Sequence, residues 1–303
     1  MAGQETPVLI VAGPTASGKT SAAGMLGRML SGHVINADSM QVYRDLRVLT
    51  ARPDAQEQAR VPHHLYGHVD ASEGYSAGRF VREAAPIIEG LRAEGTVPII
   101  CGGTGLYLDA LTRGLSPMPD VPARITADAG RRWDADPEAF RAALLAADPP
   151  MERLEPGDRQ RHVRAAAVLE ATGRPLSQWQ SAPRQPMVPG PFISTCLIPP
   201  RTRLYVQCDA RLARMVEAGA LDEVRRLMAR GLPSSLPVMK ALGVAELSAH
   251  LRGALSLDEA VELAAQETRR FAKRQVTWFR NQTSWPAYET PEELVAAVRE
   301  ALA

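Results

Sequence analysis

Short apolar runs alternate along the first third of the chain with segments in which apolar residues recur at helical spacing. The runs at 8–12, 33–37 and 97–101 have the length and composition of buried strands, and 21–30 and 76–94 have the period of helices. An alternation of strands and helices predicts a parallel sheet with helices on both faces. The predicted fold class is therefore α/β.

The pattern changes twice in the later part of the chain. Residues 124–182 are helical stretches rich in Ala, Arg, Asp and Glu, bounded by proline-containing linkers at 116–119 and 183–191. A further strand is predicted at 192–198, and helices are predicted from residue 201 onward. We therefore predict a helical insertion domain at 118–185 within a catalytic core made of 1–117 and 186–303 with its C-terminal helices.

A glycine-containing loop joins the first predicted strand to the first predicted helix. It has the phosphate-binding spacing G-x-x-x-x-G-K-[ST] and consists of Gly13, Pro14, Thr15, Ala16, Ser17, Gly18, Lys19 and Thr20. The glycines allow a tight turn whose N–H groups face an anion at the start of a helix. Lys19 can reach the outer phosphate oxygens, and the Thr20 hydroxyl can hold Mg²⁺. A polyphosphate ligand is expected.

Polar residues follow two other predicted strands, at Asp38-Ser39 and at 102–105. Ligands of open parallel sheets bind at the carboxyl ends of the strands, so these residues and the phosphate loop should converge on one pocket. Asp38 could coordinate Mg²⁺, act as a general base, or cap a turn. Thr104 could offer its hydroxyl to a ligand or cap the next helix. The residues alone leave these alternatives open.

Basic residues cluster locally, although the net charge of the 303 residues is only +1. The segment 269–274 has four cations and no acid, and smaller groups lie at 159–164 and 201–214. On a helix, five cations fall opposite an apolar arc, namely Arg269, Arg270, Lys273, Arg274 and Arg280. Clusters of one sign favour a polyanionic partner over a merely solvated face.

The cysteines and histidines point to no metal site. Cys101, Cys196 and Cys208 lie in or beside apolar runs without metal-ligand spacing, which predicts buried free thiols in a reducing compartment. Residues 51–70 contain several prolines and are predicted to be mostly loop, and their adjacent pair His63-His64 has no third ligand at zinc-site spacing.

No apolar run approaches the roughly 20 residues that span a bilayer, and the N-terminus lacks the basic and apolar regions of an export signal. The protein is therefore expected in the cytoplasm, away from membranes.

Several motifs occur together in a fixed order. They are the phosphate loop, 38–43 (DSMQVY), 51–53 (ARP), 62–65 (PHHL), 102–107 (GGTGLY) and 273–280 (KRQVTWFR). With this set the chain resembles the bacterial tRNA dimethylallyltransferases, also called isopentenyl-tRNA transferases, over nearly its full length. The phosphate loop alone would be a weak match, whereas the ordered combination is specific.

The resemblance implies a P-loop NTPase-like fold and a prenyl transfer. Members of this family move a five-carbon dimethylallyl group from its diphosphate to N6 of the adenosine on the 3′ side of the anticodon in tRNA. The implied partners are the tRNA anticodon stem-loop and dimethylallyl diphosphate, with Mg²⁺ as cofactor. The protein is expected to act as a monomer.

The resemblance also implies roles for individual residues. The phosphate loop would hold the diphosphate of the donor, and Thr20 would hold Mg²⁺. Asp38 would accept the proton of the adenine amine, Thr104 would position the adenine or a donor phosphate, and Arg211 would join Lys19 at the donor phosphates. The residues that match tRNA-holding stretches are Asp38, Ser39, Met40, Gln41, Thr104, Arg124, Gln160, Arg161, His162, Val163, Arg164, Lys273 and Arg274.

The chain departs from the family pattern at Val244, where members often have tyrosine, so a tRNA contact through that ring is not expected here. Two other classes of function compete with prenyl transfer. A small-molecule kinase or NTPase would use the same loop. A nucleic-acid-binding module without catalysis would use the basic clusters, but it would not need polar residues at three strand ends.

Overall fold

The computed structural model describes residues 5–303. Residues 1–4 lie outside the described part of the chain. They include the start of the predicted core domain and of the N-terminus that is predicted to lack an export signal. The chain divides into two compact units. Unit 1 combines the chain up to Thr112 with the chain from Met187, and unit 2 is Arg113–Pro186. The insertion predicted at 118–185 falls within unit 2.

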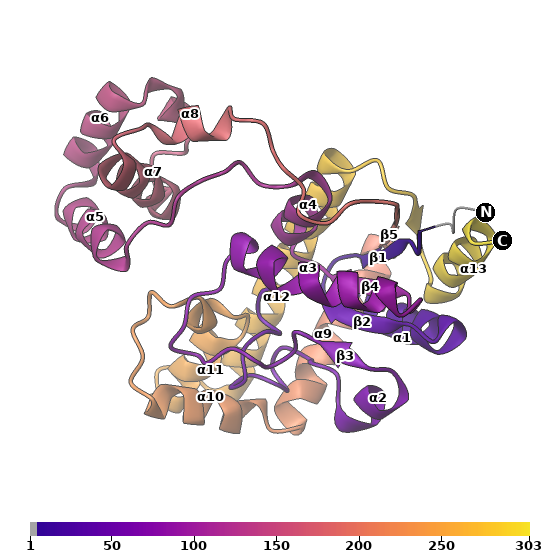
Figure 1. The fold of residues 1–303 in the computed structure, drawn as a ribbon. Coiled ribbons are helices and arrows are strands. Elements are labelled where there is room, and N and C mark those ends of the chain that lie inside the picture. Colours follow the sequence, from indigo (N-terminus) through magenta and orange to yellow (C-terminus); the bar gives the residue numbers. More distant parts are fainter. Residues whose placement is uncertain (1–4) are drawn as a thin grey trace. The chain divides into compact units, whose positions relative to one another are not determined.

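Unit 1 is built on a six-stranded sheet (Figure 1). The strands, in spatial order, are β3 (His63–His64), β2 (His33–Asn36), β4 (Pro98–Gly102), β1 (Val8–Ala12), β5 (Phe192–Leu197) and β6 (Ala287–Tyr288). All neighbouring strands are parallel. The predicted α/β class and the four strands predicted from apolar runs are confirmed, because these runs form the buried centre of the sheet.

One face of the sheet is covered by the helices α1 (Lys19–Leu30) and α13 (Pro291–Ala301). Side chains of one pleat, such as Leu9 and Val11, pack there with Leu26 and Leu294 in a single buried cluster. The helix α3 (Ala77–Ala93) packs against β4, and its N-cap Ser76 accepts a hydrogen bond from the Arg79 N–H. The predicted helix at 76–94 is therefore confirmed.

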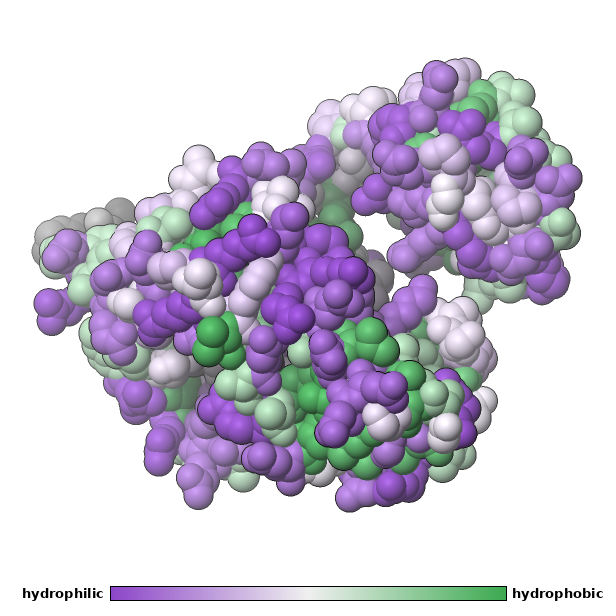
Figure 2. All heavy atoms as spheres, turned by 180° about the vertical axis from the view of Figure 1, so that it is seen from behind, coloured by the Kyte–Doolittle hydropathy of each residue, from purple (hydrophilic) through white to green (hydrophobic). Residues whose placement is uncertain are grey.

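The C-terminal half of unit 1 is mainly helical. Its helices are α9 (Arg201–Glu217), α10 (Ala220–Ala229), η2 (Pro237–Lys240), α11 (Val244–Leu251) and α12 (Leu257–Gln282). They share a hydrophobic core with the loops that follow β2 and β3, which contribute Val42, Leu46 and Val69. Hydrophobic side chains also gather on the surface of this region (Figure 2).

Three short elements differ from the sequence-based expectation. The helix α2 (Ala55–Arg60) and the strand β3 lie in a stretch predicted to be mostly loop, and β6 lies in a stretch predicted to be helical. The two edge strands have only two residues each, too few to show a hydrophobic period. No residue of α2 is buried, and the helix is set by a capping box between Asp54 and Glu57.

The helix α4 (Gly105–Arg113) leads into unit 2, which begins at its last residue. The helices that lie entirely within unit 2 are α5 (Ala123–Ala135), α6 (Pro137–Ala147), η1 (Pro149–Arg153), α7 (Arg159–Thr172) and α8 (Leu176–Gln180). Its interior is formed by two adjoining clusters around Leu144 and Trp133. The chain enters and leaves unit 2 side by side, because Leu115 pairs with Gln185 in an antiparallel bridge. None of the helices in residues 5–303 has the length and apolar character needed to cross a bilayer.

Candidate active site

The phosphate loop lies between β1 and α1, as the motif predicts. A Cβ at Gly13 would come within 2.6 Å of the Leu197 carbonyl oxygen, so only glycine fits between the loop and β5. Gly18 has φ 96°, in the left-handed region that favours glycine, where it begins α1. Lys19 is only 7% exposed, and its Nζ donates to the Pro14 carbonyl across the loop at 3.1 Å.

Three charged groups meet above this loop. Burial lowers the pKa of Lys19, and Asp38 opposes that effect by favouring the charged amine. Burial likewise lowers the pKa of Arg211 on α9, and Asp38 again opposes it. Arg211 also donates to the Thr50 carbonyl at 3.2 Å. Two cations held in a dehydrated site with one carboxylate leave a net positive charge, which suits an anionic ligand.

Asp38 is held by the last residue of β2 and by a hydrogen bond within its own turn. Its backbone N–H donates to Asn36 Oδ1, and its Oδ1 accepts from the Met40 N–H, both at 2.9 Å. The carboxylate thus closes a turn, and it also lines the cavity described below. The turn-capping alternative is correct for one oxygen of Asp38 and does not exclude a role toward a ligand.

Thr104 joins two strand ends. Its Oγ1 accepts a hydrogen bond from the Ser39 N–H at 2.9 Å, so the hydroxyl oxygen ties the β4 end to the β2 end. Among the described residues no N–H of α4 donates to the Thr104 hydroxyl, so the side-chain N-cap expected as an alternative is not formed; only the Thr104 backbone carbonyl accepts from the Tyr107 N–H, at 2.9 Å. None of residues 5–303 accepts a hydrogen bond from the Thr104 hydroxyl, so its proton is available to a ligand.

One cavity of about 250 Å³ brings these residues together. Its polar side chains include Lys19, Thr20, Asp38 and Arg211, from the phosphate loop, the β2 end and α9. Its apolar side chains come from the loop after β2, from α9, from the segment before α11 and from α12, and they are Leu49, Leu212, Met215, Leu242 and Phe271. The predicted convergence at the strand ends is therefore present for the phosphate loop and the β2 end. The prediction is wrong for the β4 end, because no residue of 102–105 lines the cavity and Thr104 adjoins it only through its bond to Ser39.

Gln41 and Ser39 line the same cavity with Met40. The Gln41 side chain is buried, and its Nε2 donates to the carbonyls of Thr50 and Ala51 at 2.9 and 3.2 Å. Gln41 therefore supports the loop that carries Leu49 and Thr50.

Sequence reasoning missed the contribution of the inner face of α12. Thr268 and Phe271 of this helix line the cavity, and Gln275 contacts the phosphate loop. Arg274, which the family resemblance assigned to tRNA, lines the cavity as well. Lys240 and Leu242, just before α11, also line the cavity. The motif at 273–280 indicated that the helix matters, but no local pattern indicated that it crosses the strand ends.

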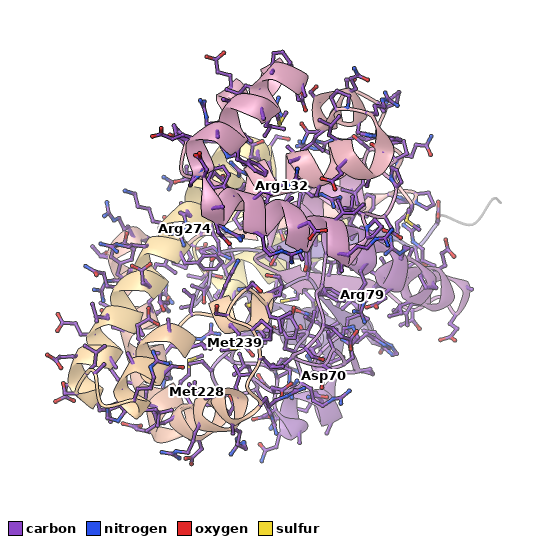
Figure 3. The ribbon with its side chains drawn as sticks, turned by 90° about the vertical axis from the view of Figure 1, so that its left-hand side faces the viewer. Asp70, Arg79, Arg132, Met228, Met239 and Arg274 are labelled. Atoms are coloured by element: carbon purple, nitrogen blue, oxygen red, sulfur yellow. The ribbon has the colours of Figure 1, made fainter. Side chains whose placement is uncertain are left out.

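The basic face of α12 is less uniform than its sequence. Arg269 forms an ion pair with Asp209, and Arg270 pairs with Glu267, so the expected face of one sign is partly neutralised. Lys273 and Arg274 are exposed and form no ion pair with the described residues. Arg274, which Figure 3 labels on α12, lies over the Phe271 ring at 5.5 Å.

The cluster at 159–164 divides in the same way. Gln160, Arg161 and Arg164 are exposed on α7, and Arg124 is exposed on α5. His162 and Val163 are instead buried in the interior of unit 2, where the His162 ring lies 4.9 Å from the Trp133 ring. The expectation that these two side chains contact tRNA is wrong, because α7 turns them toward its own core.

The other predicted features have simple structural roles. All three cysteines are buried and free, and burial raises the pKa of Cys101 and Cys196 to about 12 and that of Cys208 to about 11. No group of three His, Cys, Asp or Glu in residues 5–303 could hold a metal ion by itself. Val244 is buried in the core around α11.

Comparisons with known proteins agree on one family. The chain matches the family described as IPP transferase over residues 41–282, and the family described as isopentenyl transferase over residues 6–66. It is 49% identical to a tRNA dimethylallyltransferase of Caulobacter sp. (strain K31) over 289 residues, covering 94% of each chain. It is 54% identical to that of Rhodospirillum centenum over 279 residues, covering 91% of this chain and 89% of the relative.

Solved structures agree with this result. The structure of the tRNA isopentenylpyrophosphate transferase from Bacillus halodurans superposes with a TM-score of 0.71 at 30% identity, over 99% of this chain and 96% of that one. A eukaryotic dimethylallyltransferase acting on tRNA superposes with a TM-score of 0.75 at 29% identity, over 90% of this chain and 69% of the other. Its longer chain accounts for the smaller share.

Proposed function

The chain belongs to the IPP transferase family, and we propose that it transfers a dimethylallyl group from dimethylallyl diphosphate to N6 of the adenosine 3′-adjacent to the anticodon in tRNA. The family establishes a transferase that prenylates tRNA. The observation that carries the finer assignment is the cavity in which Lys19 and Arg211 face Asp38 beside an apolar wall. A diphosphate suits the cations, and a short isoprenoid suits the wall.

The phosphate loop and its two cations would promote departure of the diphosphate. Negative charge grows on the leaving group as the allylic C–O bond breaks, and backbone N–H groups, Lys19 and Arg211 are placed to stabilise it. Because Lys19 is buried, Arg211 is half-buried, and each is held by a bond to a backbone carbonyl, they need little reorganisation during the reaction. The exocyclic amine of the adenine then forms the new C–N bond at the allylic carbon.

Mg²⁺ fits the residues at this place. The Thr20 hydroxyl and an Asp38 carboxylate oxygen both line the cavity, and oxygen ligands completed by phosphate oxygens are those that Mg²⁺ prefers. When bound, the ion would neutralise charge on the diphosphate. We propose Thr20 as its ligand.

Asp38 is the proposed acceptor of the proton that the amine loses. Its turn fixes the carboxylate through one oxygen, and the neighbouring Thr104 hydroxyl has a proton left to donate to the adenine or to a phosphate. An adenine stacked in the anticodon loop could not reach this cavity, so the base must leave the stack to react.

Basic side chains on both units are proposed to hold the RNA. On α12 these are Lys273 and Arg274, and on unit 2 they are Arg124, Arg161 and Arg164, assisted by Gln160. We further propose that the protein acts as a monomer in the cytoplasm.

One assay tests the proposal against its alternatives. The protein is incubated with labelled dimethylallyl diphosphate or labelled ATP, each with and without tRNA. We expect label from the isoprenoid in tRNA at the adenosine 3′ to the anticodon. Phosphate transfer or release from ATP without prenyl transfer would favour a kinase or NTPase. Retention of tRNA with neither reaction would favour a binding module.

A further inference from the structure

Gln275 connects two loops that are far apart in sequence. Its side chain is 7% exposed on α12, with its amide enclosed by the strand ends. The Oε1 atom accepts from the Thr15 N–H in the phosphate loop, and the Nε2 atom donates to the Gly103 carbonyl after β4, both at 2.8 Å. One planar amide therefore spans the ends of β1 and β4.

The space around this amide is closely fitted. A Cβ at Gly103 would lie 2.4 Å from Gln275 Nε2 and 2.8 Å from the Gly13 carbonyl oxygen, so glycine at 103 admits the amide. Only one orientation of the amide satisfies both partners, because Thr15 offers a donor and Gly103 an acceptor.

The Gln275 amide completes a continuous set of contacts from the phosphate loop, where the diphosphate would bind, to Asp38, where the adenine amine would react. Thr15 bonds Gln275, and Gln275 bonds Gly103. The next residue, Thr104, accepts from the Ser39 N–H, which directly follows Asp38. The distance between the phosphate loop and the carboxylate is therefore set partly by the Gln275 side chain.

We propose that Gln275 is a positioning residue that fixes the phosphate loop relative to Asp38 and Thr104, so that the leaving diphosphate and the attacking amine are held in register. This inference rests on the proposed function. A misplacement of about 1 Å between reacting groups can cost on the order of a hundredfold in rate. The same helix presents Lys273 to solvent and Arg274 to the cavity, so Gln275 also fixes the RNA-facing helix to the phosphate loop.

The test uses Gln275→Leu, which removes both hydrogen bonds at similar volume, and Gln275→Glu. An ionised glutamate accepts from Thr15 but cannot donate to Gly103, whereas a protonated glutamate can do both. Gln266→Leu and Gln266→Glu are matched controls, because Gln266 is exposed on the same helix and does not line the cavity. Single-turnover prenyl transfer, binding of inorganic pyrophosphate, binding of an anticodon stem-loop RNA and thermal unfolding are measured for each.

For Gln275→Leu we expect a single-turnover rate about a hundredfold lower. Pyrophosphate should bind about tenfold more weakly, because the freed Thr15 N–H leaves the loop less ordered. RNA affinity should stay near that of Gln266→Leu, because the basic side chains of α12 are unchanged. The unfolding midpoint should be lower than that of Gln266→Leu, because the buried Gly103 carbonyl loses its donor, with the protein still folded at the assay temperature. Gln275→Glu should show the same losses at high pH, and its rate relative to the wild type at the same pH should recover as the pH falls, since burial raises the pKa of a carboxyl group.

Two results would overturn the role. One is a rate and a pyrophosphate affinity equal to those of the Gln266 controls. The other is a loss of rate that matches the loss of folded protein and of RNA binding, combined with no recovery of the Gln275→Glu rate at low pH. That result would make Gln275 a packing residue. Failure of the wild type to transfer the prenyl group would refute the proposed function instead, and pyrophosphate binding would still decide whether Gln275 orders the loop.

Discussion

Asp38 serves its own turn and the cavity at the same time. Its Oδ1 accepts from the Met40 N–H, and no donor within residues 5–303 is bonded to its other oxygen. A carboxylate held in this way can keep its position while it changes its protonation state or its ligands. Because both roles use the same side chain, only a substitution that preserves the turn can separate them.

Asp38→Asn is that substitution, since an amide oxygen can accept the same bond from Met40 but cannot take a proton. We expect single-turnover prenyl transfer to fall by about 10²–10⁴-fold, while pyrophosphate binding and the Mg²⁺ requirement stay near those of the wild type. The measurement is the single-turnover rate against Mg²⁺ concentration, beside a melting curve. Full recovery at high Mg²⁺ would assign Asp38 to the metal rather than to the proton.

Lys19→Ala should abolish transfer while leaving RNA binding intact, because Lys19 is buried under the phosphate loop. Pyrophosphate titrations across pH measure its role. Pyrophosphate itself titrates, so affinity is compared with that of the alanine variant at each pH. Protonated Lys19 attracts the anion, so the advantage of the wild type over the alanine variant should decline as the pH rises through the Lys19 pKa, which burial sets below the usual 10.5. A variant that loses RNA binding but keeps pyrophosphate binding would contradict the assignment.

Among the elements, α12 has the most functions. On its inner face, Phe271 lines the cavity and Gln275 bonds the phosphate loop, and on its outer face Lys273 is exposed to solvent. Carboxylates pair with Arg269 and Arg270, which leaves Lys273, Arg274 and Arg280 as the exposed cations of α12 without an ion pair among the described residues.

The double variant Lys273→Ala with Arg274→Ala should weaken tRNA binding and reduce the slope of log affinity against log salt by about one per lost phosphate contact. A matched control is Arg225→Ala with Arg226→Ala, two exposed arginines on α10 that change the net charge equally. Binding is measured over a series of salt concentrations. If both double variants have the same slope, the outer face of α12 is only solvated.

At the scale of the whole molecule, unit 2 is an insertion whose two ends meet. Leu115 and Gln185 are paired, and a Cβ at Gly114 would lie 2.3 Å from the Gln185 backbone, so the chain enters and leaves at one place. The clusters around Leu144 and Trp133 give the insertion a core of its own. Each unit therefore has the properties of an independent domain.

Replacing 115–185 with a short glycine-serine linker should leave a unit 1 that unfolds cooperatively and binds pyrophosphate within about threefold of the wild type, since no cavity residue lies in unit 2. Binding of tRNA should weaken markedly because the basic residues of unit 2 are lost. Circular dichroism melting, pyrophosphate titration and RNA binding test these points. Undiminished RNA affinity would show that unit 2 does not contact RNA.

The sequence by itself determined the features that depend on a few consecutive residues. Four strands, the helix at 76–94 and the phosphate loop could be predicted because each is encoded by local periodicity or by glycine spacing, and local signals of this kind persist in the fold. The ordered motifs also carried the family, which the comparisons confirm.

The tertiary structure decided which side chains share the cavity. Gln275 lies 260 positions from Thr15, Arg211 lies 161 positions from Thr50, and Glu223 accepts from the Val48 N–H 175 positions away. Such contacts arise from how whole helices pack, and no pattern within one segment encodes them. For the same reason the family resemblance placed His162 among the residues that hold RNA, whereas the packing of α7 buries its side chain. A helix fixes which residues share a face, and only its neighbours decide which face meets solvent.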